Sequence, residues 1–203
     1  GEEFGDGKCI IDQNKLYVVC LKDIYEINLD NFDTKSISNI YNINPIGGKS
    51  LLKINDILYI GHHSRKLSKI NLKTKEYKSW QIGPTDLNCI HNLYYYNKTI
   101  LGATGRGVFE IHNKDNLKII PSVDIFNINA QNIYYYKTDY FDIVGSIVRI
   151  AIKNHIDTTW KIISNTGSSD FFINKDDIIF CTDKGLLIYA SKSGNKKYLN
   201  ESD

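Results

Sequence analysis

The three arginines of this 203-residue chain share one spacing relative to a preceding glycine. Each arginine follows, by four residues, a glycine that ends an apolar run; the pairs are Gly61/Arg65, Gly102/Arg106 and Gly145/Arg149. The planar guanidinium group suits bidentate recognition of carboxylate or phosphate groups. Further basic or polar side chains fall near corresponding places in the sequence: Lys22, Lys184, His62 and His63. The spacing predicts a cationic surface for an acidic or phosphorylated protein segment. The alternative is a set of solvated turn residues whose shared spacing reflects repeat ancestry.

Two tyrosine triplets form a second candidate binding feature. They occupy residues 94–96 and 134–136, each at the end of a short apolar run and next to a turn. If the middle rings, Tyr95 and Tyr135, are exposed, they could stack against sugar rings or bases. The alternative is that alternate tyrosines pack in the core. The sequence leaves both interpretations open.

Residue types that perform catalysis or bind metals do not form a recognisable set. The five histidines are scattered, no CxxC pair is present, and no GxSxG motif occurs. The stretch Gly105-Arg106-Gly107 lacks the Gly-Lys-Ser/Thr ending of a phosphate-binding loop, which favours a turn. We therefore expect no metal, no cofactor and no catalytic residue.

The cysteines bear on the cellular compartment. Cys20 and Cys181 fall in the apolar stretches VVC and IIFC, so we expect both to be buried free thiols in second strands. Free thiols favour a reducing compartment. We therefore expect an intracellular protein, cytoplasmic or nuclear.

The composition is close to the average for a globular domain, with 42% hydrophobic and 24% charged residues. The net charge of +2 is too small to indicate nucleic acid or an anionic membrane. No apolar run approaches the roughly 20 residues of a membrane-spanning helix. The abundance of Ile, Asn, Lys and Tyr is typical of an AT-rich genome. Because methionine is absent, we expect an excised domain in which residues 1–6 are a tag or a flexible tail.

Five segments repeat one pattern at a spacing of about 40 residues. Each has an apolar run, a short loop, a second run, a polar turn and a third strand, and a further short strand precedes it. The segments begin at Leu16, Leu58, Thr99, Phe141 and Ile178. Asn, Asp and Lys fill the turns between the first and second strands, as tight turns require. The runs 58–60 and 178–180 are continuously apolar, which predicts sheets covered on both faces.

Four strands in each repeat of this length are typical of a propeller blade. We predict an all-β fold with almost no helix: a single-domain β-propeller of about five four-stranded antiparallel blades. The blades are expected near residues 7–40, 47–83, 86–122, 130–165 and 168–200. The alternative is that these blades form part of a six- to eight-bladed ring.

In its spacing, and in phrases such as Thr182-Asp183-Lys184-Gly185-Leu186, the chain resembles the WD40-like and sensor-type propellers. The Gly-His pair of WD40 repeats occurs once, at Gly61-His62. Trp80 and Trp160 are followed by Gln and Lys, where WD40 repeats have Asp. The resemblance therefore implies an architecture and transfers no functional residue.

A propeller holds its loops on a rigid scaffold, with the loops between second and third strands on one face, the upper face. We therefore expect a non-enzymatic protein–protein interaction scaffold that binds a protein partner, acidic or phosphorylated, through this face. One alternative is a carbohydrate-binding, small-ligand-binding or sensor propeller. Another is a propeller lyase or hydrolase, which needs His and carboxylate groups at the channel mouth. We expect neither membrane insertion nor a nucleic-acid partner.

Overall fold

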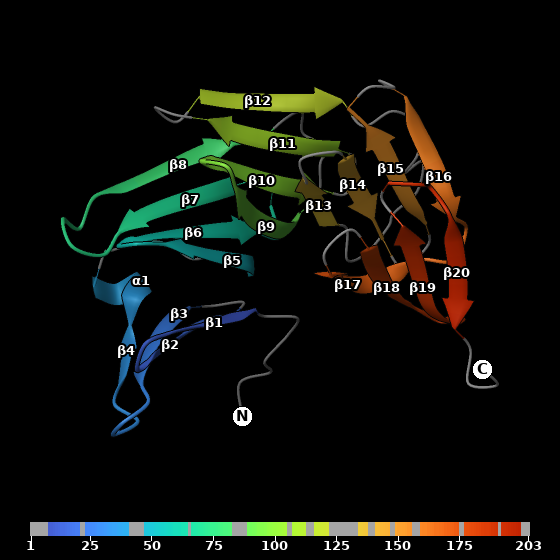
Figure 1. Cartoon of the computed structure of the whole chain (residues 1–203). Coiled ribbons are helices and arrows are strands. Elements are labelled where there is room, and N and C mark those ends of the chain that lie inside the picture. The colour runs from blue at the N-terminus through green and yellow to red at the C-terminus, as the bar shows by residue number, and fades with distance from the viewer. Residues whose placement is uncertain are drawn as a thin grey trace. The chain divides into compact units, whose positions relative to one another are not determined.

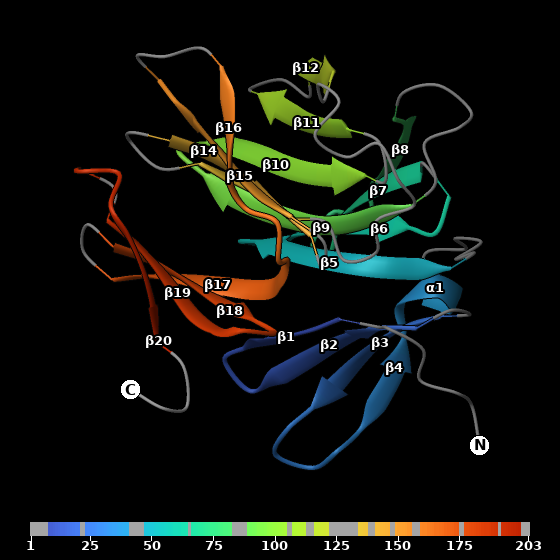
Figure 2. The same cartoon turned by 90° about the vertical axis from the view of Figure 1, so that its right-hand side faces the viewer.

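The structure of the chain is a computed structural model (Figures 1 and 2). It describes residues 8–20, 23–40, 47–64, 66–82, 89–104, 107–112, 116–121, 134–137, 141–146, 149–155, 159–174, 177–190 and 192–199. The chain forms two compact units, unit 1 (Gly1–Ile120) and unit 2 (Pro121–Asp203). Each unit is described by itself.

Unit 1 carries three four-stranded antiparallel sheets among its described residues, and the strands of each sheet pair in chain order. Sheet 1 consists of β1 (Cys9–Asp12), β2 (Lys15–Val19), β3 (Ile24–Asn28) and β4 (Thr34–Ser36). Sheet 2 consists of β5 (Gly48–Ile54), β6 (Ile57–His62), β7 (Lys66–Asn71) and β8 (Tyr77–Gln81). Sheet 3 consists of β9 (Ile90–Tyr96), β10 (Thr99–Thr104), β11 (Gly107–His112) and β12 (Asn116–Pro121), and it ends at the boundary of the unit.

Unit 2 carries two further sheets of the same kind in its described part. Sheet 4 consists of β13 (Tyr134–Lys137), β14 (Phe141–Gly145), β15 (Ile150–Asn154) and β16 (Trp160–Ser164). Sheet 5 consists of β17 (Ser168–Asn174), β18 (Asp177–Thr182), β19 (Gly185–Ala190) and β20 (Lys196–Leu199).

The predicted all-β fold of five four-stranded antiparallel sheets is confirmed. Each sheet falls within one of the expected blade ranges, and the second strands begin within one residue of the predicted positions. The helix α1 (Ile37–Ile40) is a single turn after β4, and the Asn39 amide donates to Ser36 Oγ at 3.1 Å. The expected tail, residues 1–6, lies outside the described residues.

One turn geometry recurs between the third and fourth strands of sheets 1, 2 and 5. Its fourth residue has left-handed backbone, with φ of 59° at Phe32, 64° at Lys75 and 73° at Gly194. In each case the amide of that residue donates to the last carbonyl of the third strand, as from Lys75 to Asn71 at 2.9 Å. Only glycine adopts this conformation without steric cost. The repeat is thus preserved in backbone geometry where the residue type differs.

Sheets 1 and 2 pack face to face. Leu58 and Ile60 of β6, both 0% exposed, share a core cluster with Tyr17 and Val19 of β2. We call the face of a sheet that meets the preceding sheet its leading face, and the opposite face its trailing face. Leu58 and Ile60 therefore lie on the leading face of sheet 2.

The trailing face of sheet 2 packs against sheet 3. Tyr59 and Leu67 share a second core cluster with Ile90 and Phe109 of sheet 3. Because residues 58–60 are consecutive and all buried, coverage of both faces is confirmed for this second strand. Continuous apolarity, rather than alternation, follows from this double coverage.

Aromatic rings join the two sheets of unit 2. The Phe171 ring lies 5.0 Å from that of Tyr134 and 5.3 Å from that of Tyr136, measured between centroids. It also lies 6.0 Å from the Phe180 ring of its own sheet. Tyr134 and Tyr136 therefore belong to the trailing face of sheet 4, and the two phenylalanines to the leading face of sheet 5.

Candidate functional site

In each sheet, the turn between the second and third strands lies at the end of the strands where the first strand begins. We call this end of the sheet the loop edge. In sheet 2, His62 pairs with Gly48, and the His63 amide donates to the Gly47 carbonyl at 2.5 Å. The loop edge is where the sequence predicts the cationic surface.

Three of the predicted binding residues lie outside the described residues: Lys22, Arg65 and Arg106. Arg149 is described and half-buried, in a loop-edge turn of sheet 4 where the Ser146 amide donates to its carbonyl at 2.9 Å. Lys184 is exposed in the corresponding turn of sheet 5, and its amide donates to Thr182 Oγ1 at 3.2 Å. Each occupies the expected turn of its own sheet, and convergence of the basic residues stays a prediction.

Two of the glycines that align the arginines in the sequence are not equivalent in the fold. Gly61 is the fifth residue of β6 and lies on the trailing face, because an added Cβ would meet Ile90 of sheet 3. Gly102 is the fourth residue of β10 and lies on the leading face, where an added Cβ would meet the Phe109 ring. A fixed offset from these glycines is therefore not a fixed structural position. The shared spacing does not by itself align the arginines.

His62 has a structural place in sheet 2. Its side chain is 1% exposed, and its Nε2 atom lies 2.8 Å from Ser68 Oγ. That hydroxyl lies 3.2 Å from the Tyr77 hydroxyl, which extends the contact to β8. The prediction that His62 contacts a partner is wrong, because its ring is enclosed by these strands. His63, the next residue, is exposed.

The two middle tyrosines have different surroundings. Tyr95 is 47% exposed, whereas Tyr135 is 0% exposed. Tyr135 pairs with Val144, the fourth residue of β14. In sheet 3, the fourth residue of β10 pairs with the core residue Leu93, so Tyr135 is the structural equivalent of Leu93 and not of Tyr95. The cause is that more residues separate the first two strands in sheet 4 than in sheet 3. The stacking prediction is wrong for Tyr135 and stays a prediction for Tyr95.

The cysteines also differ from expectation. None of the four described cysteines forms a disulfide, but Cys181 is exposed and Cys20 is partly exposed, so the prediction that both are buried is wrong. Cys20 follows β2 rather than lying in it. The buried cysteine is Cys89, which is 8% exposed.

Two β-bulges place basic side chains at the loop edge of unit 1. The register of β5 shifts at Lys49 and that of β9 shifts at His91, so that each is the extra residue of its strand. The two positions are equivalent, since each lies two residues before a core leucine, Leu51 or Leu93. Bulges re-aim side chains and are frequent beside functional sites.

The bulges of sheets 2 and 3 lie side by side. Ser50 Oγ donates to the Ile90 carbonyl at 2.9 Å, which joins the residues next to the two bulges. Lys49 and His91 are only 8% and 7% exposed. Two exposed basic residues, one directly before β1 and one directly after β6, complete the group. We call these four the cationic cluster: Lys8, Lys49, His63 and His91.

The charges of this cluster act on His91. Burial is the largest cause that lowers its pKa, and the charges of Lys49, His63 and Lys8 lower it further, to about 4. Burial raises the pKa of Cys89, whose Sγ lies 3.1 Å from His91 Nε2. Both groups are therefore neutral at pH 7. The Cys89–His91 pair therefore does not form the thiolate–imidazolium ion pair of an activated cysteine nucleophile.

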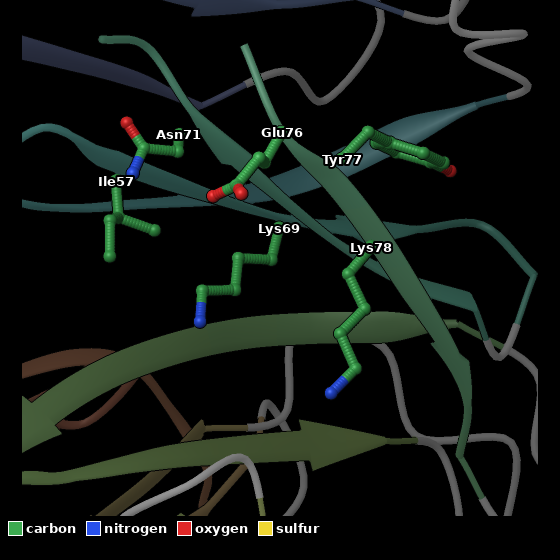
Figure 3. Close-up of a pocket in the computed structure, with 6 residues that line it drawn as sticks. All are labelled: Ile57, Lys69, Asn71, Glu76, Tyr77 and Lys78. Carbon is green, nitrogen blue, oxygen red and sulfur yellow. The ribbon is translucent and has the colours of Figure 1, made fainter. Parts of the chain in front are cut away.

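Two hollows of about 400 Å³ each lie in unit 1. The first, shown in Figure 3, is lined by Ile57, Lys69, Asn71, Glu76, Tyr77 and Lys78. The Lys78 ammonium lies 4.8 Å from the centre of the Trp80 ring. The second lies between the turns of sheets 1 and 2, where Lys53 Nζ is 2.6 Å from Asp12 Oδ2. Among their described lining residues, neither hollow includes a histidine or a cysteine.

Within the described ranges, no group of three or more His, Cys, Asp or Glu side chains could hold a metal ion. In the same part of the chain, no helix has the length and apolarity to cross a membrane.

No protein-family model matches the chain, and no curated protein matches it. Solved structures resemble it at low identity. The extracellular domain of a candidate hybrid two-component system from B. thetaiotaomicron has a TM-score of 0.72 and 16% identity, over 97% of this chain and 28% of that one. The WD40 β-propeller domain of Doa1 has a TM-score of 0.69 and 10% identity, over 95% of this chain and 67% of that one. The β-propeller domain of Cps50 (Swd1) from Myceliophteria thermophila has a TM-score of 0.64 and 8% identity, over 91% and 64%.

The chain thus spans less than a third of the sensor-type extracellular domain and about two thirds of the two other propeller domains. At these identities the likeness concerns the fold alone. The resemblance to WD40-like and sensor-type propellers is confirmed at that level. The chain has a β-propeller fold built from four-stranded antiparallel sheets.

Proposed function

We propose that the chain is a non-enzymatic binding scaffold whose cationic cluster docks an acidic or phosphorylated segment of a partner protein. The observation that carries this proposal is the pair of adjacent bulges at Lys49 and His91. They gather two nearly buried basic side chains at one edge, and the charges of the exposed Lys8 and His63 act on one of them, His91. The fold supports such a role, because a rigid stack of sheets holds its loops in place before binding.

An anion at this edge would meet a positive potential. Charges interact more strongly where the effective dielectric constant is below that of water, and nearly buried charges are screened less by salt. Lys49, at 8% exposure, is such a charge. A bound anion would also favour the protonated form of His91 and raise its pKa. Binding to the cluster is therefore coupled to proton uptake.

The neutral Cys89–His91 pair supports binding rather than covalent chemistry at this edge. The exposed free thiols of Cys9 and Cys181 support an intracellular location as part of the proposal, since a reducing compartment keeps such thiols free.

Fluorescence anisotropy with three labelled peptides of equal length tests the proposal. One peptide is rich in glutamate, one carries phosphoserine in a neutral background, and one is rich in lysine. We expect the two anionic peptides to bind, with an affinity that falls as salt is added. The lysine-rich peptide is expected not to bind. Lys8→Glu combined with His63→Glu should weaken the binding by about tenfold or more, as the loss of charged hydrogen bonds does.

The matched control reverses two exposed lysines of unit 1 outside the loop edge. Lys35→Glu combined with Lys75→Glu changes the net charge at least as much, and it should leave the affinity nearly unchanged. If neither anionic peptide binds, or if both double variants bind equally well, the cationic cluster is not the docking site.

A small-ligand or sensor propeller is the second candidate. It is favoured by the half-exposed ring of Tyr95 and by the likeness to an extracellular domain of a two-component system. Binding of a neutral sugar that Tyr95→Ala abolishes, and that Lys8→Glu with His63→Glu leaves intact, would support this candidate instead.

A further inference from the structure

The hollow shown in Figure 3 lies on the trailing face of sheet 2. Ile57, which begins β6, lines it and also packs against the core cluster that sheets 2 and 3 share. Ile57 pairs with Asn71, the last residue of β7, so the hollow lies at the end of the sheet opposite the loop edge. Its volume of about 400 Å³ is within the range of sites that bind small molecules. The hollow is therefore a candidate ligand site, distinct from the cationic cluster.

Two lysines from neighbouring strands line this hollow. Lys69 of β7 pairs directly with Lys78 of β8, so their side chains leave the sheet on the same face, as Figure 3 shows. Residues paired in this way have Cβ atoms about 4.5–5.5 Å apart, and like charges at such positions destabilise a sheet. An anion between the two ammonium groups would remove that cost. The pairing therefore favours a negatively charged ligand.

Aromatic rings hold both lysine side chains. Lys69 Nζ lies 6.0 Å from the centre of the Tyr59 ring, and Lys78 Nζ lies 4.8 Å from that of the Trp80 ring. Both rings pack on the trailing face of sheet 2, where Tyr59 is buried. A cation over an aromatic ring is attracted by the negative face of that ring. The two charges are thus positioned before a ligand arrives, which lowers the entropic cost of binding.

Asn71 and Glu76 add polar groups of other kinds. Asn71 Oδ1 accepts hydrogen bonds from the Lys73 and Thr74 amides, both at 3.0 Å. Those bonds orient the side chain so that its nitrogen, a donor, lies toward Ile57 and the hollow (Figure 3). The Glu76 carboxylate lines the hollow and accepts a hydrogen bond from Thr74 Oγ1 at 2.9 Å. A ligand would therefore meet two cations, an amide donor and a carboxylate acceptor.

We propose that the hollow binds a small hydroxylated anion, such as a sugar phosphate or a sugar acid. The phosphate or carboxylate group lies between the Lys69 and Lys78 ammonium groups, and hydroxyl groups of the ligand donate to Glu76. A bare anion is repelled by the charge of Glu76, and a neutral sugar gains little from the two lysines. The inference goes beyond the proposed function, because it concerns the other end of sheet 2 and a ligand of another class.

Titration calorimetry of the whole chain with four probes tests the proposal. The probes are glucose 6-phosphate, glucuronate, glucose and inorganic phosphate. We expect one or both hydroxylated anions to bind about tenfold more tightly than glucose or inorganic phosphate. The tighter of the two identifies the anionic group that the lysines accept. If neither binds, or if glucose or inorganic phosphate binds as tightly, the proposal is overturned.

Substitutions in the hollow locate the binding. Lys78→Gln removes one exposed ammonium group and should weaken binding of the preferred anion by about tenfold or more. Glu76→Gln should lower the preference for that ligand over inorganic phosphate, since it removes the charge that attracts hydroxyl groups and repels a bare anion.

Lys66→Gln is the matched control. Lys66 also lies over a ring, 5.6 Å from the centre of that of Tyr77, but it is three residues before Lys69 and so lies on the opposite face of β7. The change should leave the affinity for the hydroxylated anion unchanged. An equal loss of affinity in Lys66→Gln and Lys78→Gln would overturn the assignment to the hollow.

The hollow and the cationic cluster are separable by the same measurements. Lys8→Glu combined with His63→Glu should leave binding of the hydroxylated anion nearly unchanged. Lys78→Gln should leave binding of the phosphoserine peptide nearly unchanged. If binding of the hydroxylated anion depends on Lys8 and His63 but not on Lys78, the anion occupies the cationic cluster, and the assignment to the hollow is wrong.

Discussion

The Sγ atom of Cys89 lies 3.1 Å from Nε2 of His91, with both side chains nearly buried at the loop edge of unit 1. The contact orients an imidazole ring that burial keeps unprotonated, aided by the charges of three neighbouring basic residues. His91 is neutral within a cationic cluster, so it can take up a proton when the pH falls or when an anion binds. It is therefore the first residue at which to test the site.

Acidification should destabilise the protein through His91. Its pKa is lowered from 6.5 to about 4 in the folded state, so the unfolded chain binds more protons between these two values. Stability is full above pH 6.5 and is lost as the pH falls through this window, by roughly 3 kcal/mol in total. Urea unfolding at a series of pH values measures the loss. His91→Gln should flatten this pH dependence, whereas Ser64→Ala, which changes an exposed residue of the same unit and removes no titratable group, should not; equal slopes in both variants would contradict the assignment.

Removing the Ser68 hydroxyl should destabilise sheet 2. Ser68→Ala deprives the buried His62 ring of a hydrogen-bond partner at 2.8 Å and breaks the contact with Tyr77. The expected loss is about 1–3 kcal/mol of the free energy of unfolding. Ser64→Ala, at an exposed serine of the adjacent turn, is the control and should change stability by less than about 0.5 kcal/mol. Similar denaturation midpoints for the two variants would refute a structural role for the His62 contact.

The recurrent turn offers a backbone test. Gly194→Ala places a Cβ on a residue with φ of 73° and should cost about 1 kcal/mol of stability. Lys75→Ala is the matched control, because Lys75 already bears a Cβ at φ of 64° in the same turn of sheet 2. Chemical denaturation should separate the two variants. A Gly194→Ala protein as stable as the wild type would mean that the turn relaxes.

The arginine prediction remains open to experiment. Arg65→Glu combined with Arg106→Glu should cost about 1–3 kcal/mol of affinity for an acidic peptide if these side chains join the cationic cluster. Circular dichroism of the double variant should match that of the wild type. Titration calorimetry decides the matter, and unchanged affinity would limit the site to the four residues of the cluster.

The repeat carries most of the information about the fold. Residue type and period place the second strands within one residue, at Lys15, Ile57 and Thr99 in unit 1, because β-branched and aromatic runs bounded by Asn and Asp allow few other structures. Register is harder to predict, since it depends on turn length. One longer connection in sheet 4 moves Tyr135 into the core, although its sequence matches that of Tyr95.

The candidate site is harder still to read from the sequence. Lys49 and His91 gain their position from bulges, and a bulge leaves no local signature in residue type. An alignment of the two first strands that superimposes Leu51 on Leu93 would also have superimposed Lys49 on His91. The exposure of Cys181 is equally hard to predict, because an apolar strand has the same residue types whether its outward-facing positions are covered or exposed.

Within each sheet, the described strands pair in chain order, so the residues that the inter-strand hydrogen bonds join are separated by few residues in the sequence. Folding rates rise as the mean sequence separation of contacts falls, and single hairpins form within about 1–10 μs. Each sheet can therefore nucleate by itself, and the slower step is the docking of one finished face on another. When only sheet 1 has been synthesised, its hydrogen bonds can already form. Its apolar trailing face stays exposed until sheet 2 packs on it. Synthesis from the N-terminus would then assemble the molecule in the order in which its faces become available.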